Sequence, residues 1–210
     1  MARVPFLHRN EIKTDLIRLI ARFLKEDRCY TGAIPLVFTA CNAIFQVFNG
    51  SVHEMEKCNH EEANTRLILH AVKSKHDVVI VAKDTDVLVL MVWAFAFLDV
   101  ERKWFFRKDD GQFADVGEIG SYFGRGVCLR LPSFHALSGC DTSSYFYNEG
   151  KVKLLKTVIK SPRYHALLDS LGKEKVVRDS DMEGVERFVQ MLMYSGKESY
   201  VETRVRIYHK

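Results

Sequence analysis

The sequence of 210 residues has five cysteines, and no two of them stand in a CxxC spacing. Disulfide-stapled secreted domains and zinc ribbons both depend on paired cysteines, so the spacing argues against both classes. Scattered thiols suit a reducing compartment, and we expect an intracellular location, with nucleus and cytoplasm both left open. The cysteines are Cys29, Cys41, Cys58, Cys128 and Cys140.

Long apolar runs and a strong charge of one sign are also missing. The longest apolar run, from Val87 to Leu98, is too short to span a bilayer, and the first five residues hold no signal-peptide core. We therefore expect no membrane partner. The net charge of +4 permits nucleic-acid binding without arguing for it, so any basic surface must come from local clustering.

Several catalytic motifs are absent as well. The sequence has no GxSxG, no Walker A motif and no dinucleotide fingerprint, so no small-molecule cofactor is expected. The HExxH spacing of zinc proteases fails because Asn64, not a histidine, stands four residues after His60. Cys58, His60 and Cys140 make a poor zinc set without a paired spacing.

Hydrophobic periodicity predicts alternating strands and helices, and the 47% hydrophobic content allows a sizeable core. This alternation predicts an α/β fold: a three-layer core with a mostly parallel sheet, followed by a helical C-terminal part. The predicted strands cover 34–39, 43–48, 78–82 and 103–107. The predicted helices cover 11–25, 60–73, 87–98, 116–123, a stretch from Leu131-Pro132, 152–159, 162–171 and 181–194. We expect acidic residues in the first turn of the helix 60–73, where the dipole favours negative charge, and Asp115 as the N-cap of the helix 116–123.

Three separated acidic clusters are the most informative positive feature: Glu61-Glu62-Ala63-Asn64, Asp84-Thr85-Asp86 and Gly139-Cys140-Asp141. The middle cluster follows the apolar run 78–82, and α/β sheets place ligands beyond the carboxyl ends of their strands. Carboxylates gathered there suit a hard divalent cation, Mg²⁺ or Mn²⁺. Taken alone, the middle cluster is better explained as a solvated strand-to-helix turn with Asp86 as a helix N-cap.

The order of the clusters resembles the flap-endonuclease-like branch of the PIN-domain nucleases. In that family an ExE/D pair, a DxD pair and a GxD aspartate are metal ligands. The resemblance carries these roles onto Glu62 and Asn64, onto Asp84 and Asp86, and onto Asp141, with Glu61 as a weaker ligand. It also implies a PIN-like core over 1–140. A helix-three-turn-helix-like module that binds the DNA backbone, with the C-terminal helices, would fill 141–210 of the same structural unit.

A closer resemblance is to a group of mobile-element-associated animal proteins. Their HEEADTR, DTDV, LPxxHxxxGCDTTS, GKxK and ERFV motifs match this sequence at 60–66, 84–87, 131–144, 150–153 and 186–189. Two departures stand out. Asn64 replaces the usual aspartate, which removes one anionic ligand, and the early acidic strand of the nucleases is missing. We therefore expect an N-terminally incomplete domain.

The resemblance implies a nuclease that hydrolyses DNA or RNA phosphodiesters, with DNA favoured. One metal ion would activate a water and the other would stabilise the leaving 3′ oxygen. Asp84, Asp86, Asp141 and Glu62 would be its catalytic residues. The alternative is a degenerate domain that binds nucleic acid or a protein. Nothing in the sequence indicates an oligomeric state.

Basic residues near the acids supply candidate phosphate contacts. A lysine-rich segment follows the third cluster, and Lys153, Lys156 and Lys160 share one helical face. Arg66 and Lys83 adjoin the other two clusters; a solvated flank explains Lys83 equally well. His135 is interpreted as a satisfied core residue, with a contact to Asp141 as the alternative. The predicted nucleic-acid contacts are Lys151, Lys153, Lys156, Lys160, Arg66 and Lys83.

Overall fold

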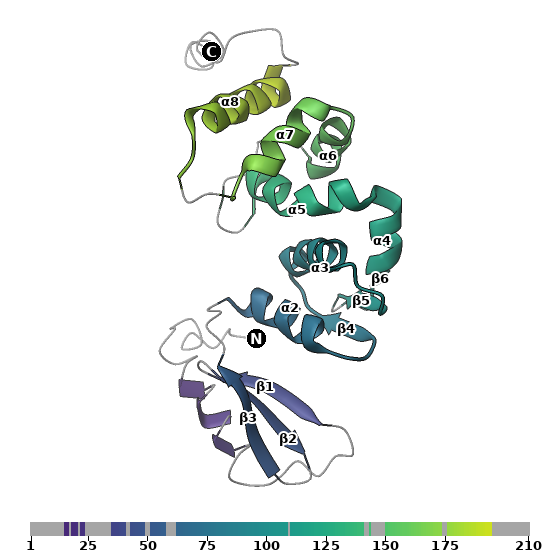
Figure 1. The fold of residues 1–210 in the computed structure, drawn as a ribbon, viewed down its shortest axis with the longest axis vertical. Coiled ribbons are helices and arrows are strands. Elements are labelled where there is room, and N and C mark those ends of the chain that lie inside the picture. Colours follow the sequence, from purple (N-terminus) through teal and green to yellow (C-terminus); the bar gives the residue numbers. More distant parts are fainter. Residues whose placement is uncertain are drawn as a thin grey trace, which may run out of the picture. The chain divides into compact units, whose positions relative to one another are not determined.

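The computed structural model describes residues 15–16, 18–20, 22–23, 35–40, 43–48, 51–57, 62–108, 110–140, 143, 150–173 and 176–194 (Figure 1). The chain divides into two compact units, Met1–Leu69 and His70–Lys210, and each is described by itself. The boundary expected at residue 140 lies inside the second unit. Among the described residues, no helix has both the length and the apolar composition needed to cross a membrane.

The first unit contains an antiparallel sheet of three strands in the order β1-β2-β3. The strands are β1 (Leu36–Ala40), β2 (Ala43–Phe48) and β3 (Ser51–Lys57). Two residues separate each strand from the next, and such short connections allow only antiparallel pairing. Its core is small: Phe45 and Val47 are buried, and the rings of Phe38 and Phe45 stack at 5.5 Å.

Helix α2 (Ala63–Lys73) begins in the first unit and runs into the second. Glu62 immediately precedes it, and its carbonyl accepts hydrogen bonds from the Thr65 hydroxyl and the Arg66 amide. We expected acidic residues in the first turn of this helix, but that turn contains none.

The second unit begins with a β-α-β segment that positions the middle acidic cluster. Strand β4 (Val78–Val81) leads into α3 (Thr85–Leu98), which returns to β5 (Trp104–Arg107), and β4 and β5 pair in parallel. A hairpin then brings β6 (Phe113–Asp115) antiparallel to β5. Trp104 and Phe106 are buried on one face of the sheet, whereas Val79, Val81 and Phe113 are more than half exposed.

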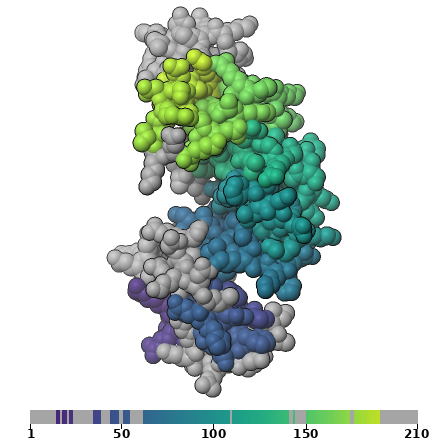
Figure 2. Space-filling model, viewed as in Figure 1, coloured from purple at the N-terminus to yellow at the C-terminus, as the bar shows by residue number. Residues whose placement is uncertain are grey.

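Helices make up the rest of the second unit (Figure 1). Helix α5 lies between α3 on one side and α6 and α7 on the other. Figure 2 shows the green and yellow-green surfaces of α7 and α8 against one another. The helices are α4 (Val116–Phe123), α5 (Arg125–Ser138), α6 (Lys151–Ile159), α7 (Pro162–Ser170) and α8 (Asp179–Tyr194).

A shared apolar core joins four of these helices. Phe188 of α8 is fully buried, and its ring meets that of Tyr164 of α7 edge to face at 5.4 Å. Phe134 contributes from α5, and Leu154 and Val158 contribute from α6. This core holds α5 and α6 together, and both helices carry residues of the candidate site.

The structure corrects the predicted fold class. A three-layer, PIN-like core with one mostly parallel sheet is wrong: two small three-stranded sheets are present among the described residues, one antiparallel and one mixed. The physical reason is the length of the connections. Among strands that are neighbours within one of these sheets, only β4 and β5 are joined by a segment that contains a crossover helix, and only they pair in parallel.

Individual elements agree better with the sequence patterns. The strand Ala43–Phe48 and the helix Val116–Phe123 are confirmed, and Asp115 caps that helix as predicted. Strands β3 and β6 were not predicted. The helix predicted to start at Leu131 starts at Arg125 instead, because Gly124, with φ of 76°, ends α4 and leads directly into α5. Pro132 therefore lies inside the helix.

Candidate functional site

The middle acidic cluster lies where β4 ends and α3 begins. Asp84 is the N-cap of α3: its backbone is extended, with φ of −82° and ψ of 127°, and its Oδ1 accepts the amide of Asp86 at 2.8 Å. The N-cap role weighed for Asp86 in the sequence thus belongs to Asp84. Asp86 lies in the first turn of the helix, where the dipole stabilises a negative charge.

Helix α5 brings a histidine to this cluster. His135 lies near the end of α5, which stops at Gly139 with φ of 106°, a conformation that disfavours other residues. Ser143 is hydrogen-bonded to the end of the helix: its hydroxyl donates to the Ala136 carbonyl at 2.7 Å and accepts the Cys140 amide at 3.1 Å. Asp141, which lies between Cys140 and Ser143 in the sequence, is outside the described residues.

The central contact of the site joins Asp86, His135 and Lys151. His135 Nε2 lies 2.6 Å from Asp86 Oδ1, and Lys151 Nζ lies 3.3 Å from His135 Nδ1. The histidine side chain is 14% exposed and the Asp86 side chain 26%, so this hydrogen bond is largely shielded from water. Lys151, the first residue of α6, is exposed.

The chemistry of the three groups assigns the histidine tautomer. A lysine ammonium only donates hydrogen bonds, so Nδ1 of His135 must be the acceptor. The ring proton then sits on Nε2 and is donated to the Asp86 carboxylate. His135 therefore connects an anionic side chain on α3 with a cationic one on α6.

Helix α6 presents the predicted lysines to solvent. Lys151, Lys153, Lys156 and Lys160 are all exposed, while Leu154 and Val158 of the same segment are buried in the shared core. The helix thus has an apolar side and a basic side. Lys83, next to the middle cluster, is exposed as well.

The first acidic cluster belongs to the other unit. Glu62 is exposed just before α2, and Asn64 and Arg66 are half-buried in its first turns. They lie within Met1–Leu69, whereas Asp84 and Asp86 lie within His70–Lys210. Glu61 lies outside the described residues, as do Cys58 and His60. Convergence of the three clusters therefore stays a prediction.

The candidate cation ligands Asp84 and Asp86 lie in the second unit. In the described part of the chain, no three His, Cys, Asp or Glu side chains come close enough together to hold a metal ion. Mg²⁺, however, is commonly bound through only one or two carboxylates, with substrate phosphates and waters completing its shell. A carboxylate has about four lone-pair sites, so the hydrogen bond at Oδ1 of Asp86 leaves it able to ligate. Asp84 and Asp86 therefore stay candidate ligands for such an ion.

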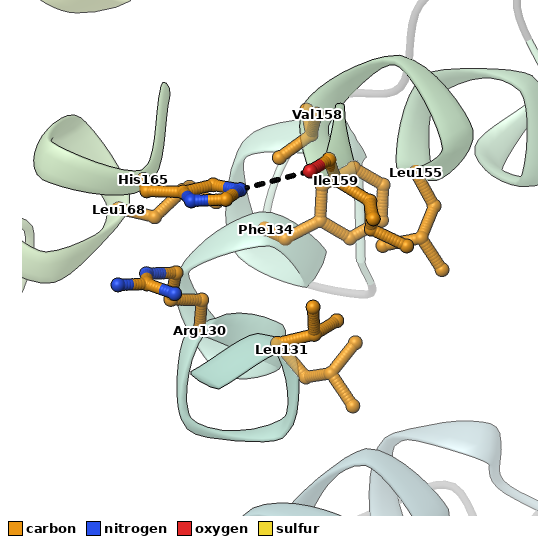
Figure 3. A pocket seen from close by; sticks show the side chains of 9 residues that line it. Arg130, Leu131, Phe134, Leu155, Val158, Ile159, His165 and Leu168 are labelled. Carbon is orange, nitrogen blue, oxygen red and sulfur yellow. Dashed lines mark hydrogen bonds between the residues drawn. The ribbon is translucent and has the colours of Figure 1, made fainter. Parts of the chain in front are cut away.

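The second unit also has cavities lined by other residues. Figure 3 shows an apolar cavity among Leu131, Phe134 and Leu168, beside the hydrogen bond from His165 to the Ile159 carbonyl. Its volume of about 10 Å³ has room for a single water molecule. A cleft between α7 and α8 is lined by three arginines. Two of these pair with carboxylates of α8, Arg178 with Asp181 and Arg187 with Glu183.

His135 is the site residue whose partner the sequence did not identify. It was interpreted as a satisfied core residue, and the structure shows its side chain largely buried and hydrogen-bonded to Asp86; the alternative contact, with Asp141, lies outside the described residues. On the helix, His135 lies on the same side as buried Phe134 and Ser138. No local pattern indicates that α3 begins on that side.

Comparison of the chain with protein-family models, with curated proteins and with solved structures gave no match.

Proposed function

We propose that this chain hydrolyses nucleic-acid phosphodiesters with a divalent cation, Mg²⁺ or Mn²⁺, at Asp84 and Asp86. The contact of Asp86, His135 and Lys151 carries the proposal, because it places a carboxylate pair beside a basic helix. A phosphodiester substrate needs both: cation ligands for the reacting phosphate and cations for its neighbours. DNA is the proposed substrate, and the protein is proposed to work inside the cell.

Each residue has a separate task in this proposal. Asp84 and Asp86 ligate the cation, which supplies Lewis-acid polarisation of the phosphoryl oxygens. His135 orients the Asp86 carboxylate through its Nε2 proton, as hydrogen-bond partners of metal ligands commonly do. The lysines of α6 contact phosphates without reading bases, so sequence-independent binding is expected.

Nucleic-acid binding without hydrolysis is the second candidate. The observation that favours it is the lack, among the described residues, of a group of three ligands for a metal ion. In this case α6 binds the phosphate backbone electrostatically, and the affinity for nucleic acid falls steeply as the salt concentration rises.

Calorimetric titration with Mn²⁺ separates the two functions. We expect the folded protein to bind Mn²⁺, and Asp86→Asn to weaken that binding at least about tenfold, the effect of losing even an outer-shell partner. A labelled single-stranded oligodeoxythymidylate, incubated with Mn²⁺, reports cleavage on a gel.

Asp99→Asn is the matched control. Asp99 ends α3 with φ of 52°, a left-handed conformation that asparagine tolerates. The variant removes one carboxylate from the opposite end of the helix that carries Asp86. It should bind Mn²⁺ like the wild type. A folded wild type that binds the oligonucleotide but no Mn²⁺ would overturn the hydrolase and leave the binding protein.

A further inference from the structure

We propose that His135 couples phosphate binding at Lys151 to cation binding at Asp86, so that each event strengthens the other. This inference rests on the proposed function, since it concerns the same acids and the same helix. It adds a regulatory property: the cation site becomes fully ordered only when nucleic acid is bound.

The first step is the dependence of Asp86 on the histidine tautomer. Asp86 receives a proton donor only while Nε2 of His135 is protonated, and the bond at the other ring nitrogen selects that tautomer. Lys151 makes that bond at Nδ1, at 3.3 Å, which is longer than a strong charge-assisted hydrogen bond. The carboxylate is therefore oriented through a lysine that is itself loosely held.

The second step is the position of Lys151. It is the exposed first residue of α6, two residues before Lys153 in the basic segment predicted to contact phosphates. An ammonium has three donors, so Lys151 can bond Nδ1 of His135 and a phosphate oxygen at once. A bound phosphate would restrict the flexible Lys151 side chain. The hydrogen bond to His135 would then cost less side-chain entropy, because most of that entropy is already lost on phosphate binding.

The third step separates this coupling from simple attraction. A divalent cation and a phosphate attract each other directly, and this attraction involves no histidine. His135 contributes the part of the coupling that is lost when either hydrogen bond of its imidazole is removed. Thermodynamic linkage requires the same factor in both directions: Mn²⁺ raises oligonucleotide affinity as much as the oligonucleotide raises Mn²⁺ affinity.

The test measures that factor in the full chain. A fluorescent phosphorothioate oligothymidylate, chosen to resist hydrolysis, is titrated by anisotropy without Mn²⁺ and with saturating Mn²⁺. We expect the wild type to bind the oligonucleotide at least about fivefold more tightly with Mn²⁺, the lower end of usual coupling. Lys151→Met and His135→Phe should both reduce this ratio.

Lys156→Met is the matched control for charge. It removes one lysine from the exposed side of the same helix, so both oligonucleotide affinities should fall while their ratio stays at the wild-type value. His135→Gln should restore part of the ratio, because its amide can donate to Asp86 and accept from Lys151. Lys151 is exposed, so Lys151→Met keeps the test valid if His135→Phe fails to fold.

The outcomes distinguish this inference from the proposed function. If the wild type binds both ligands and the ratio is unchanged in Lys151→Met and His135→Phe, the coupling is wrong and the proposed function stands. If the wild type fails to bind Mn²⁺, or fails to bind the oligonucleotide, the proposed function is wrong and the coupling is wrong with it. A reduced ratio in both variants, with Lys156→Met unaffected, supports the coupling.

Discussion

Asp181 shows at the scale of a single residue how a carboxylate is stabilised outside the candidate site. Hydrogen bonds from Arg178 and Ser170 hold the pKa of Asp181 below its ordinary value of 3.8, with partial desolvation opposing them. Its Oδ1 accepts the Ser170 hydroxyl at 2.7 Å, and its Oδ2 accepts Nε of Arg178 at 2.9 Å. These bonds tie the end of α7 to the start of α8.

The lowered pKa of Asp181 predicts a pH dependence of stability. The unfolded chain takes up the proton first as pH falls, so acid favours unfolding. The contribution is complete above the unfolded-state value of 3.8 and is lost as pH drops through the lower folded-state pKa. Urea unfolding should show Asp181→Asn less stable than wild type at neutral pH, with the gap narrowing in acid.

Asp179→Asn is the control for this experiment, because it removes a first-turn carboxylate of α8 and leaves the three bonded groups intact. A gap between wild type and Asp181→Asn that is the same at pH 7 and in strong acid would contradict the assigned role of the hydrogen bonds.

At the scale of an element, Asp84 has two roles that substitution can separate. As the N-cap of α3 it accepts the Asp86 amide, and as a carboxylate it is a candidate cation ligand. Asp84→Ala should lower the free energy of unfolding by about 1 kcal/mol, the usual effect of losing a cap. Asp84→Asn should keep most of that stability, since an asparagine side chain also caps.

Both Asp84 variants should weaken Mn²⁺ binding, because neither retains the anionic oxygens. Urea unfolding and calorimetric titration of the same samples would check the two effects. Equal stability losses in Asp84→Ala and Asp84→Asn would show that the cap hydrogen bond contributes little to α3.

Element boundaries were predictable where the signal is local. Asp115 accepts the amides of Gly117 and Glu118, an N-cap that the local sequence indicates. The start of α5 was not predictable in the same way, because proline favours the first turn of a helix and Pro132 suggested a start there. The structure instead tolerates Pro132 inside α5, where it cannot donate to the carbonyl of Cys128.

At the scale of the second unit, Phe188 is the clearest test of the shared core. It is fully buried beside Tyr164, so Phe188→Ala should leave a cavity and lower the free energy of unfolding by about 3–5 kcal/mol. Urea unfolding monitored by circular dichroism would measure it. Phe188→Leu, which keeps most of the apolar volume, should cost clearly less. Equal, small losses in both variants would mean that α8 does not close this core.

The sequence by itself determined most of the local structure. Capping residues and apolar periodicity act over a few neighbouring positions, so the strand Ala43–Phe48, the cap at Asp115 and the basic side of α6 follow from them. The short connection between the predicted strands 34–39 and 43–48 already implied that these two strands pair antiparallel, which a mostly parallel sheet does not accommodate.

Only the tertiary structure decided which distant groups meet. His135 is 49 residues from Asp86 and 16 from Lys151, and no periodicity relates them. Their contact depends on how α5 packs between α3 and α6, which the buried side chains of several elements determine together. Local hydrogen bonding specifies a helix, whereas the choice of packing partner is a property of the whole core. The acids and His135 were therefore visible in the sequence, and the pairing of His135 with Asp86 was not.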